Sequence, residues 1–318
     1  MLTSDTTLLM TSSVYKQVSK LMGNRFEISV VSDNESWANR CITAAIEEIR
    51  RIERLLTTFD ESSQTNHINR NAGIKPVKVD KEIFDLINRS KKISELTQGA
   101  FDISYGSIDK SLWNFDKTMT RLPDQQTAKR LVRLINYKNI LLDENHSTVF
   151  LKQKGMRIGF GGIGKGYAAE MAKALLKQKG VTSGIVNAAG DLAVWGYQPG
   201  GKPWTIGIAN PDSARQAFSY LEITDTAVAT SGNYEKFVLI DGKKYSHTID
   251  PKTGLPIKGI KSVTIICPNA EIADGMATRV MIMGGKVGLD LINQVKGLEG
   301  IIIDDNDNIY TSKNIHLK

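Results

Sequence analysis

Regularly spaced apolar residues predict most of the secondary structure of this chain. Over residues 38–56 they recur every three or four positions, the spacing of an amphipathic helix with one buried face. Three residues that commonly cap a helix N-terminus precede this stretch: Asp33, Asn34 and Ser36. Before them, residues 18–31 alternate between apolar and polar side chains, which predicts a strand. A polar loop is expected over residues 57–75.

Further helices follow, separated by strands and irregular segments. A helix is expected from Asp80 to Gly99, a residue type that favours helix C-termini, and residues 100–125 are expected to be irregular. The other predicted helices cover residues 127–135, the stretch from the glycine-rich residues 159–166 to Gly180, residues 270–283 and residues 286–294.

Short strands dominate the second half of the chain. They are predicted over residues 140–142, 148–151, 185–188, 237–240, 244–249 and 260–267. Asp241-Gly242 lies between two of them and is a strong two-residue hairpin signal; a last hairpin is expected near residues 305–307. Because strands outnumber crossover helices, we predict an α+β fold with antiparallel or mixed sheets packed against helices.

Composition narrows the class of protein. The chain has 318 residues and a formal charge of +7 without a basic block, which argues against a nucleic-acid tail and suits an anionic substrate. Two cysteines on apolar positions and four scattered histidines give no disulfide or zinc pattern. We expect a flexible segment over residues 1–17 and one domain over residues 18–318, two interlocked lobes being the alternative.

The N-terminal sequence bears on localisation. No Lys or Arg precedes Lys16, and the segment has neither a sustained apolar run nor a cysteine for lipid attachment. No apolar stretch elsewhere is long enough to cross a bilayer. The expectation is therefore a cytoplasmic protein without a transmembrane segment.

Residues 159–166 form a glycine-rich segment ahead of a predicted helix. From Gly159, the spacing matches the start of a P-loop, but Gly166 stands where a metal-binding Ser or Thr is required. A P-loop nucleotide switch is therefore disfavoured. A helix N-terminus with Lys165 still suits a phosphate or pyrophosphate, while close packing of the backbone is an equally good explanation.

Two other segments carry candidate chemistry. Asp274 and Thr278 are four residues apart on a predicted helix, so their oxygens share one face and can ligate Mg²⁺, although a cap and a helix-facing Thr explain them as well. His247 ends a predicted strand beside Ser246, Thr248 and Asp250, where it can act as a general base or serve a structural role.

Together with five other segments, these motifs resemble the FAD:protein FMN transferase family, also called the ApbE family. The resemblance covers residues 22–285. In order, the segments are Met-Gly-Asn-Arg-Phe (22–26), Leu-Thr-Thr-Phe (56–59), Gly-Ala-Phe-Asp-Ile-Ser (99–104), Gly-Gly-Ile-Gly-Lys-Gly-Tyr (161–167), Asn-Ala-Ala-Gly-Asp (187–191), Ala-Thr-Ser-Gly-Asn-Tyr (229–234), Ser-His-Thr-Ile-Asp-Pro-Lys-Thr-Gly (246–254) and Ala-Asp-Gly-Met-Ala-Thr (273–278).

The resemblance implies a T-fold-like ApbE architecture and assigns roles to individual residues. The Gly162 carbonyl and the side chains of Asp274 and Thr278 would hold Mg²⁺, with Mn²⁺ as an alternative. His247 would be the base and Lys165 would face the pyrophosphate. The FAD-binding residues would be Met22, Phe59, Ala100, Phe101, Asp102, Lys165 and Ile249. Taken singly, Phe59 and Phe101 fit the core, which is the commoner position of a Phe, and Asp102 fits a turn cap. Four positions depart from the family pattern: Gly159, Gln64, Asn233 and Glu235.

The implied reaction is Mg²⁺-dependent transfer of FMN from FAD to a Thr or Ser hydroxyl of an acceptor protein, with release of AMP. The acceptor would present a short exposed loop and would be a redox enzyme or a subunit of a membrane redox pump. Two alternatives share the same residues. One is an FAD pyrophosphatase that uses water, and the other is a non-catalytic FAD-binding protein. Relatives that are exported make a periplasmic or inner-membrane location the alternative to the cytoplasm.

Overall fold

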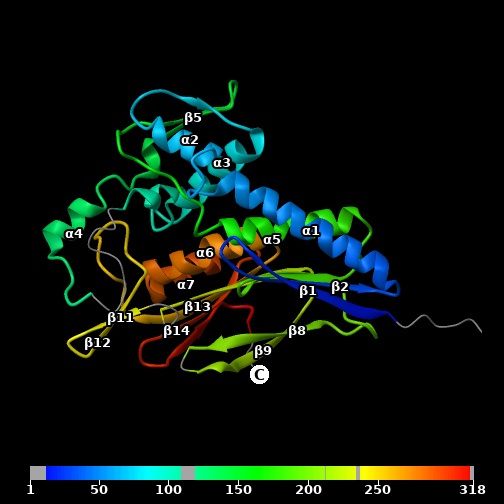
Figure 1. Ribbon diagram of the computed structural model, residues 1–318. Helices are drawn as coiled ribbons and strands as arrows, with labels where there is room; N and C mark the ends of the chain where they lie inside the picture. The colour runs from blue at the N-terminus through cyan, green and yellow to red at the C-terminus, as the bar shows by residue number, and fades with distance from the viewer. Residues whose placement is uncertain (1–11, 109–118, 212, 234–236, 316–318) are drawn as a thin grey trace, which may run out of the picture.

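An eight-stranded antiparallel sheet is the centre of the molecule (Figure 1). The computed structural model describes residues 12–108, 119–211, 213–233 and 237–315. The strand order is β1-β2-β6-β7-β10-β13-β14-β15. The bounds are β1 Ser13–Leu21, β2 Asn24–Ser32, β6 Gly184–Ala188, β7 Asp191–Trp195, β10 Thr226–Gly232, β13 Ile260–Cys267, β14 Glu299–Asp304 and β15 Ile309–Thr311. All neighbouring pairs are antiparallel, which confirms the predicted α+β class.

Helices cover one face of this sheet, and a hairpin covers part of the other (Figure 1). The covering helices are α1 Glu35–Leu56, α5 Gly164–Gln178, α6 Ala270–Met283 and α7 Gly285–Gln294. The main hydrophobic core fills the space between them and the sheet. On the opposite face, β8 Trp204–Asn210 pairs with β9 Ser213–Ile223, and Trp204 packs on Leu192, Val194 and Val228.

Two smaller assemblies complete the described structure (Figure 1). One contains α2 Gln64–Arg70, α3 Lys81–Leu96 and the three strands β3 Val77–Lys78, β4 Ile140–Asp143 and β5 Thr148–Leu151. The other contains α4 Gln125–Leu131 and the hairpin of β11 Phe237–Ile240 with β12 Lys243–Ser246, which share a small apolar cluster. The short 3₁₀ helices are η1 Ile103–Ser107 and η3 Tyr137–Asn139.

The apolar pattern of α1 predicts its buried face correctly. The eight buried residues of the helix are Ala38, Cys41, Ile42, Ala45, Ile46, Ile49, Ile52 and Leu56. Of the three candidate caps, Asn34 is the one used, because its side chain accepts a hydrogen bond from the Trp37 backbone N–H at 2.9 Å. The Asp241-Gly242 turn is also confirmed, with φ angles of 50° and 72°, the positive values that a type I′ hairpin requires.

The structure corrects the prediction in two places. First, a strand starts at Ser13, inside the segment 1–17 that was expected to be flexible, because β1 pairs along its length with β2 through the Met22-Gly23 turn. Second, the expected loop over residues 57–75 contains α2, whose N-cap Ser63 accepts from the Asn66 backbone N–H. Ile68 is the one apolar residue of this seven-residue helix, so the sequence has no periodic apolar pattern that would predict it.

In the described part of the chain, every helix is too short or too polar to cross a lipid bilayer.

Candidate active site

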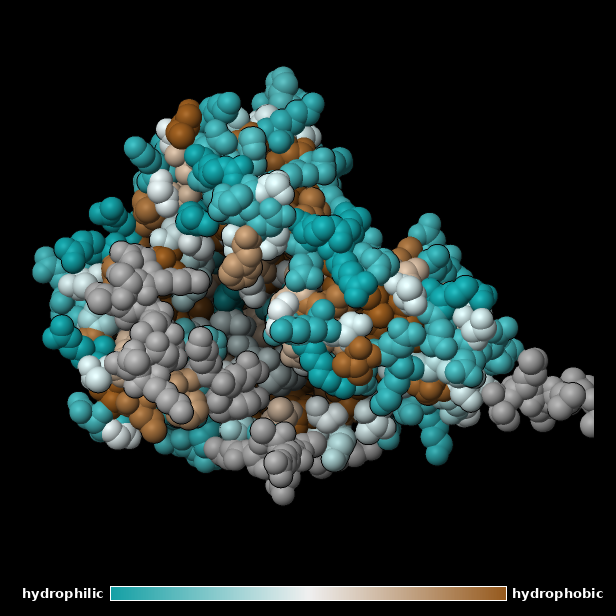
Figure 2. All heavy atoms as spheres, viewed as in Figure 1, coloured by the Kyte–Doolittle hydropathy of each residue, from teal (hydrophilic) through white to brown (hydrophobic). Residues whose placement is uncertain are grey.

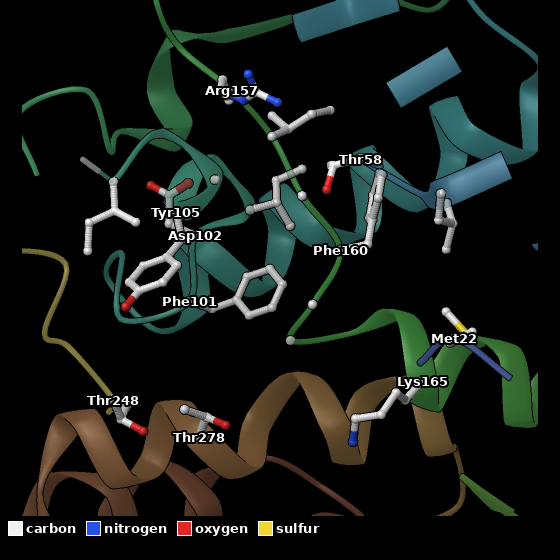
Figure 3. Close-up of a pocket in the computed structure, with 18 of the residues that line it drawn as sticks. Met22, Thr58, Phe101, Asp102, Tyr105, Arg157, Phe160, Lys165, Thr248 and Thr278 are labelled. Atoms are coloured by element: carbon white, nitrogen blue, oxygen red, sulfur yellow. The ribbon is translucent and has the colours of Figure 1, made fainter. Parts of the chain in front are cut away.

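A cavity of about 1040 Å³ lies where the helices, the β1–β2 turn and the smaller assemblies meet. Figure 2 shows a hollow near the centre of the viewed face, above α6, and Figure 3 shows the side chains that line the cavity. All the candidate site residues except Asp274 line it: Met22, Phe59, Ala100, Phe101, Asp102, Gly162, Lys165, His247, Ile249 and Thr278. Segments that are far apart in the sequence are thus brought to one chamber.

The glycine-rich turn allows α5 to begin directly against α6. A Cβ atom built on Gly166 would lie 2.1 Å from the Ala270 carbonyl oxygen and 2.7 Å from the Asp274 Cβ. No side chain fits there, which explains why a P-loop Ser or Thr is absent. A hydrogen bond joins the two helices at this contact, because Asp274 Oδ2 accepts from the Gly166 backbone N–H at 2.9 Å.

The candidate metal ligands lie on both sides of this contact. Gly162 and Thr278 line the cavity, while Asp274 is 7% exposed and precedes Thr278 by four residues on α6. Asp274 Oδ1 accepts no hydrogen bond from the described residues, and Thr278 Oγ1 shares a 2.9 Å hydrogen bond with Ser231.

This donor set fits a hard divalent cation. It offers a carboxylate, a hydroxyl and a backbone carbonyl, and phosphate oxygens and water would complete the six oxygen ligands that Mg²⁺ prefers. Among the described residues, no three acidic, histidine or cysteine side chains form a metal cluster.

Lys165 lies in the first turn of α5 and forms an ion pair with Asp191. Asp191 is buried and begins β7 after a turn in which Ala189 and Gly190 both have positive φ angles. Lys165 lines the cavity (Figure 3), and its ammonium group has the Asp191 carboxylate as a partner. To reach a phosphate it must share or leave that partner.

His247 follows the last residue of β12 and lines the cavity, half-buried. The local chain is held on both sides of it, because Ser246 Oγ accepts from the Thr248 backbone N–H at 3.1 Å and Ile249 pairs with Pro256. The imidazole is thus presented from a fixed strand–turn junction, as the sequence predicts.

Apolar groups line the cavity beside these polar ones. Phe59 is 98% exposed at the rim, so the interpretation of this residue as a core aromatic was wrong. Phe101, Ala100 and Ile249 are buried and form part of the wall. Met22 occupies the β1–β2 turn with a φ angle of 51° and projects toward the cavity (Figure 3). A planar ring system can enter between such groups.

Asp102 both lines the cavity and caps η1. Its Oδ1 accepts from the Ser104 backbone N–H at 2.8 Å and from the Ser104 hydroxyl at 2.6 Å, and its Oδ2 accepts from the Tyr137 backbone N–H at 2.6 Å. Burial raises the pKa of the Asp102 carboxyl, whereas the bonds to Ser104 and Tyr137 lower it. The turn-cap role is confirmed, and any contact with substrate would be additional.

The residues that depart from the family pattern make local contacts where the structure describes them. Gln64 lies outside the cavity lining and binds Asp80, accepting from its backbone N–H at 2.8 Å. Gly159 donates to the Ile103 carbonyl at 2.9 Å, and Asn233 donates its side-chain amide to the Ile260 carbonyl at 2.8 Å. Tyr234 and Glu235, which end and follow the segment 229–234, lie outside the described residues.

Sequence reasoning missed several residues that line this cavity, and among them is the charged residue Arg279. It directly follows Thr278, and its guanidinium carbon lies 4.8 Å from the centroid of the Phe101 ring. The only signal in the sequence is its place after the Asp274–Thr278 pair on an otherwise apolar helix turn.

The fold and the cavity define an α+β protein in which a helix N-terminus and several oxygen groups lie beside an apolar wall in one cavity. Comparison with known proteins agrees. The profile of the ApbE family matches residues 22–302. A Klebsiella pneumoniae protein described as an FAD:protein FMN transferase is 32% identical, covering 94% of this chain and 92% of its own. One from Salmonella typhimurium is 28% identical, covering 86% and 80%.

Solved structures give the same result. The ApbE protein from Thermotoga maritima superimposes with a TM-score of 0.85 at 31% identity, covering 95% of this chain and 97% of its own. The apo form of the Pseudomonas stutzeri flavinyl transferase ApbE gives 0.84 at 25% identity, covering 96% of each chain. The chain belongs to the ApbE family.

Proposed function

We propose that this chain is an FAD:protein FMN transferase that depends on Mg²⁺ and modifies a Thr or Ser hydroxyl of an acceptor protein. One observation carries the proposal. The candidate metal ligands Gly162 and Thr278, the candidate base His247 and the exposed side chain of Phe59 all line one cavity. Family membership and relatives described as FAD:protein FMN transferases support the same reaction.

The reaction exchanges one phosphate bond for another. The acceptor hydroxyl attacks the phosphorus on the FMN side of FAD and loses its proton. The bond between this phosphorus and the bridging oxygen of the diphosphate breaks, and AMP leaves with that oxygen. Little covalent chemistry is required from the protein, so positioning and charge dominate. Bound Mg²⁺ would neutralise charge on the diphosphate oxygens.

The residues of this chain would bind the cation, hold the flavin ring and stabilise phosphate charge. Asp274, Thr278 and the Gly162 carbonyl would hold the cation. Phe59 and Met22 would hold the isoalloxazine ring against the apolar wall, which excludes water from part of the site. Lys165 would stabilise phosphate charge by exchanging part of its contact with Asp191 for a phosphate oxygen.

His247 would accept the hydroxyl proton during the transfer. A hydroxyl is a poor nucleophile at neutral pH, and general-base catalysis contributes about 10²–10⁴-fold in rate. Because the cavity is recessed, the acceptor would present its Thr or Ser on a short exposed loop. A redox enzyme or a redox-pump subunit is the proposed acceptor class, since covalent FMN is useful where electrons are transferred.

The product formed from FAD separates the proposed function from its alternatives. Wild-type protein is incubated with FAD, Mg²⁺ or Mn²⁺ and a candidate acceptor, and the acceptor is then measured by intact-mass spectrometry. The proposal predicts an acceptor heavier by one esterified FMN, and AMP in equal amount. Free FMN with an unmodified acceptor would identify an FAD pyrophosphatase instead. Bound, uncleaved FAD would identify a binding protein and contradict catalysis.

A further inference from the structure

Arg279 carries a positive charge into the cavity. It lies on α6, one residue after Thr278, and lines the cavity. Within the described part of the chain, its guanidinium forms no ion pair within 4.0 Å, and its Nε atom is fully buried without a hydrogen-bond partner. A buried guanidinium in this state is costly unless a ligand supplies the counter-charge.

The position of the guanidinium is fixed from two sides. One face stacks on Phe101, with 4.8 Å from the guanidinium carbon to the ring centroid. Its edge lies against the glycine-rich turn, because a Cβ atom built on Gly162 would be 2.0 Å from Nη2. Glycine at position 162 thus leaves space for the arginine, which is held where the turn meets the cavity.

The acids around Arg279 are committed to other partners. Asp102 accepts its hydrogen bonds from Ser104 and Tyr137, and Asp274 accepts from the Gly166 backbone N–H. Both carboxylates act on the guanidinium through space: their charges raise the pKa of Arg279, whereas burial, the larger influence, lowers it. Neither provides the planar two-oxygen contact that arginine prefers.

Arg279 differs in this respect from the other cation at the turn. Lys165 is ion-paired with the buried Asp191, so a phosphate must compete with a carboxylate for it. Arg279 offers donors beside Gly162 with no such competitor among the described side chains. Of the two, Arg279 is therefore the better placed to receive an incoming anion.

We propose that Arg279 is a diphosphate-binding residue of this enzyme, which donates two hydrogen bonds to phosphate oxygens of FAD beside the cation site. The proposal rests on the proposed function for the identity of the substrate. The predicted contact is not specific to FAD, since any ligand with adjacent phosphates that reaches the cavity would use it. It follows that the diphosphate is bound partly by this side chain and only partly by the divalent cation.

Binding without catalysis tests this inference. ADP, FAD and riboflavin are titrated into wild-type protein and into Arg279→Met in the presence of EDTA, by calorimetry or flavin fluorescence. Charge-assisted hydrogen bonds of this kind predict that Arg279→Met binds ADP and FAD about 10- to 100-fold more weakly, with riboflavin affinity changed less than about threefold. Arg54→Met, which removes an exposed charge from the end of α1, serves as the control and should bind all three as wild type does.

A second variant covers a failure of Arg279→Met to fold. Arg279→Lys keeps the charge and an aliphatic stem but loses the two-pronged contact, so ADP affinity should fall by a smaller factor, about 3- to 10-fold. Unchanged ADP affinity in either folded variant would overturn the proposal and leave Arg279 as a packing partner of Phe101. These assays contain no acceptor and no metal, so a chain that binds ADP through Arg279 but transfers no FMN would contradict the proposed function alone.

Discussion

Replacing Gly166 by alanine tests the contact between α5 and α6 that positions the proposed cation ligands. The new Cβ would lie 2.1 Å from the Ala270 carbonyl oxygen, whereas carbon and oxygen ordinarily approach to about 3.3 Å. The obstacle is backbone and cannot rotate away, so the helices must separate by about 1 Å. Overpacking of this kind costs about 3–4 kcal/mol, and the higher helix propensity of alanine returns about 1 kcal/mol.

The net loss for Gly166→Ala is therefore about 2–3 kcal/mol, which lowers the unfolding midpoint of a chain of this size by about 3–5 °C. Differential scanning calorimetry measures it. Gly161→Ala is the matched control in the same turn, because a Cβ there meets no atom within 4 Å, and its midpoint should stay within about 1 °C of wild type. Separation of the helices also moves Asp274 from the Gly166 N–H, so Mg²⁺ affinity should fall with stability. An unchanged midpoint for Gly166→Ala would refute the packing described here.

Two further predictions concern His247 and Cys267. His247→Ala should slow FMN transfer about 10²–10⁴-fold while FAD affinity stays within about twofold, with the exposed His146→Ala as control; equal losses of rate and affinity would make His247 a binding residue. Burial raises the pKa of the Cys267 thiol from 9.0 to about 11, so its contribution to stability is present below pH 9 and is lost as pH rises toward 11. Urea unfolding should show wild type losing about 2 kcal/mol more than Cys267→Ala between about pH 8 and about pH 10.5, and equal losses would contradict the assigned burial.

Sequence periodicity predicted the helices and strands that bury one face and whose ends are marked by capping or turn residues. In α1, eight apolar positions at helical spacing and a neighbouring Asn cap define the helix and its start. The strand β13 matches its expected range from Ile260 to Cys267. Elements whose stability comes from distant partners were missed. The strand β7 is almost wholly buried between β6 and β10, so it lacks an alternating pattern, and the short helix α2 depends on Ser63 and on packing.

The same distinction between local and distant signals applies to the residues of the candidate site. Residue types with obvious chemistry, such as Asp274, Thr278 and His247, could be proposed from spacing and from the family resemblance. The Asp191 partner of Lys165 could not be found in this way, since it lies 26 positions away and its role follows from sheet pairing. Arg279 was overlooked because an arginine in a helix is ordinarily solvated, and only the approach of Phe101 and Gly162 shows that it is confined.

The most direct measurement of the central claim is Mg²⁺-dependent FMN attachment by wild-type protein and by Asp274→Ala. Intact mass of the acceptor is followed over time at increasing Mg²⁺, and calorimetry confirms that the variant is folded. If Asp274 holds the cation through Oδ1, which accepts no hydrogen bond from the described residues, wild type adds one FMN and the variant adds none, or adds it only at far higher Mg²⁺. Full-rate attachment by folded Asp274→Ala at the same Mg²⁺ concentration would contradict the account.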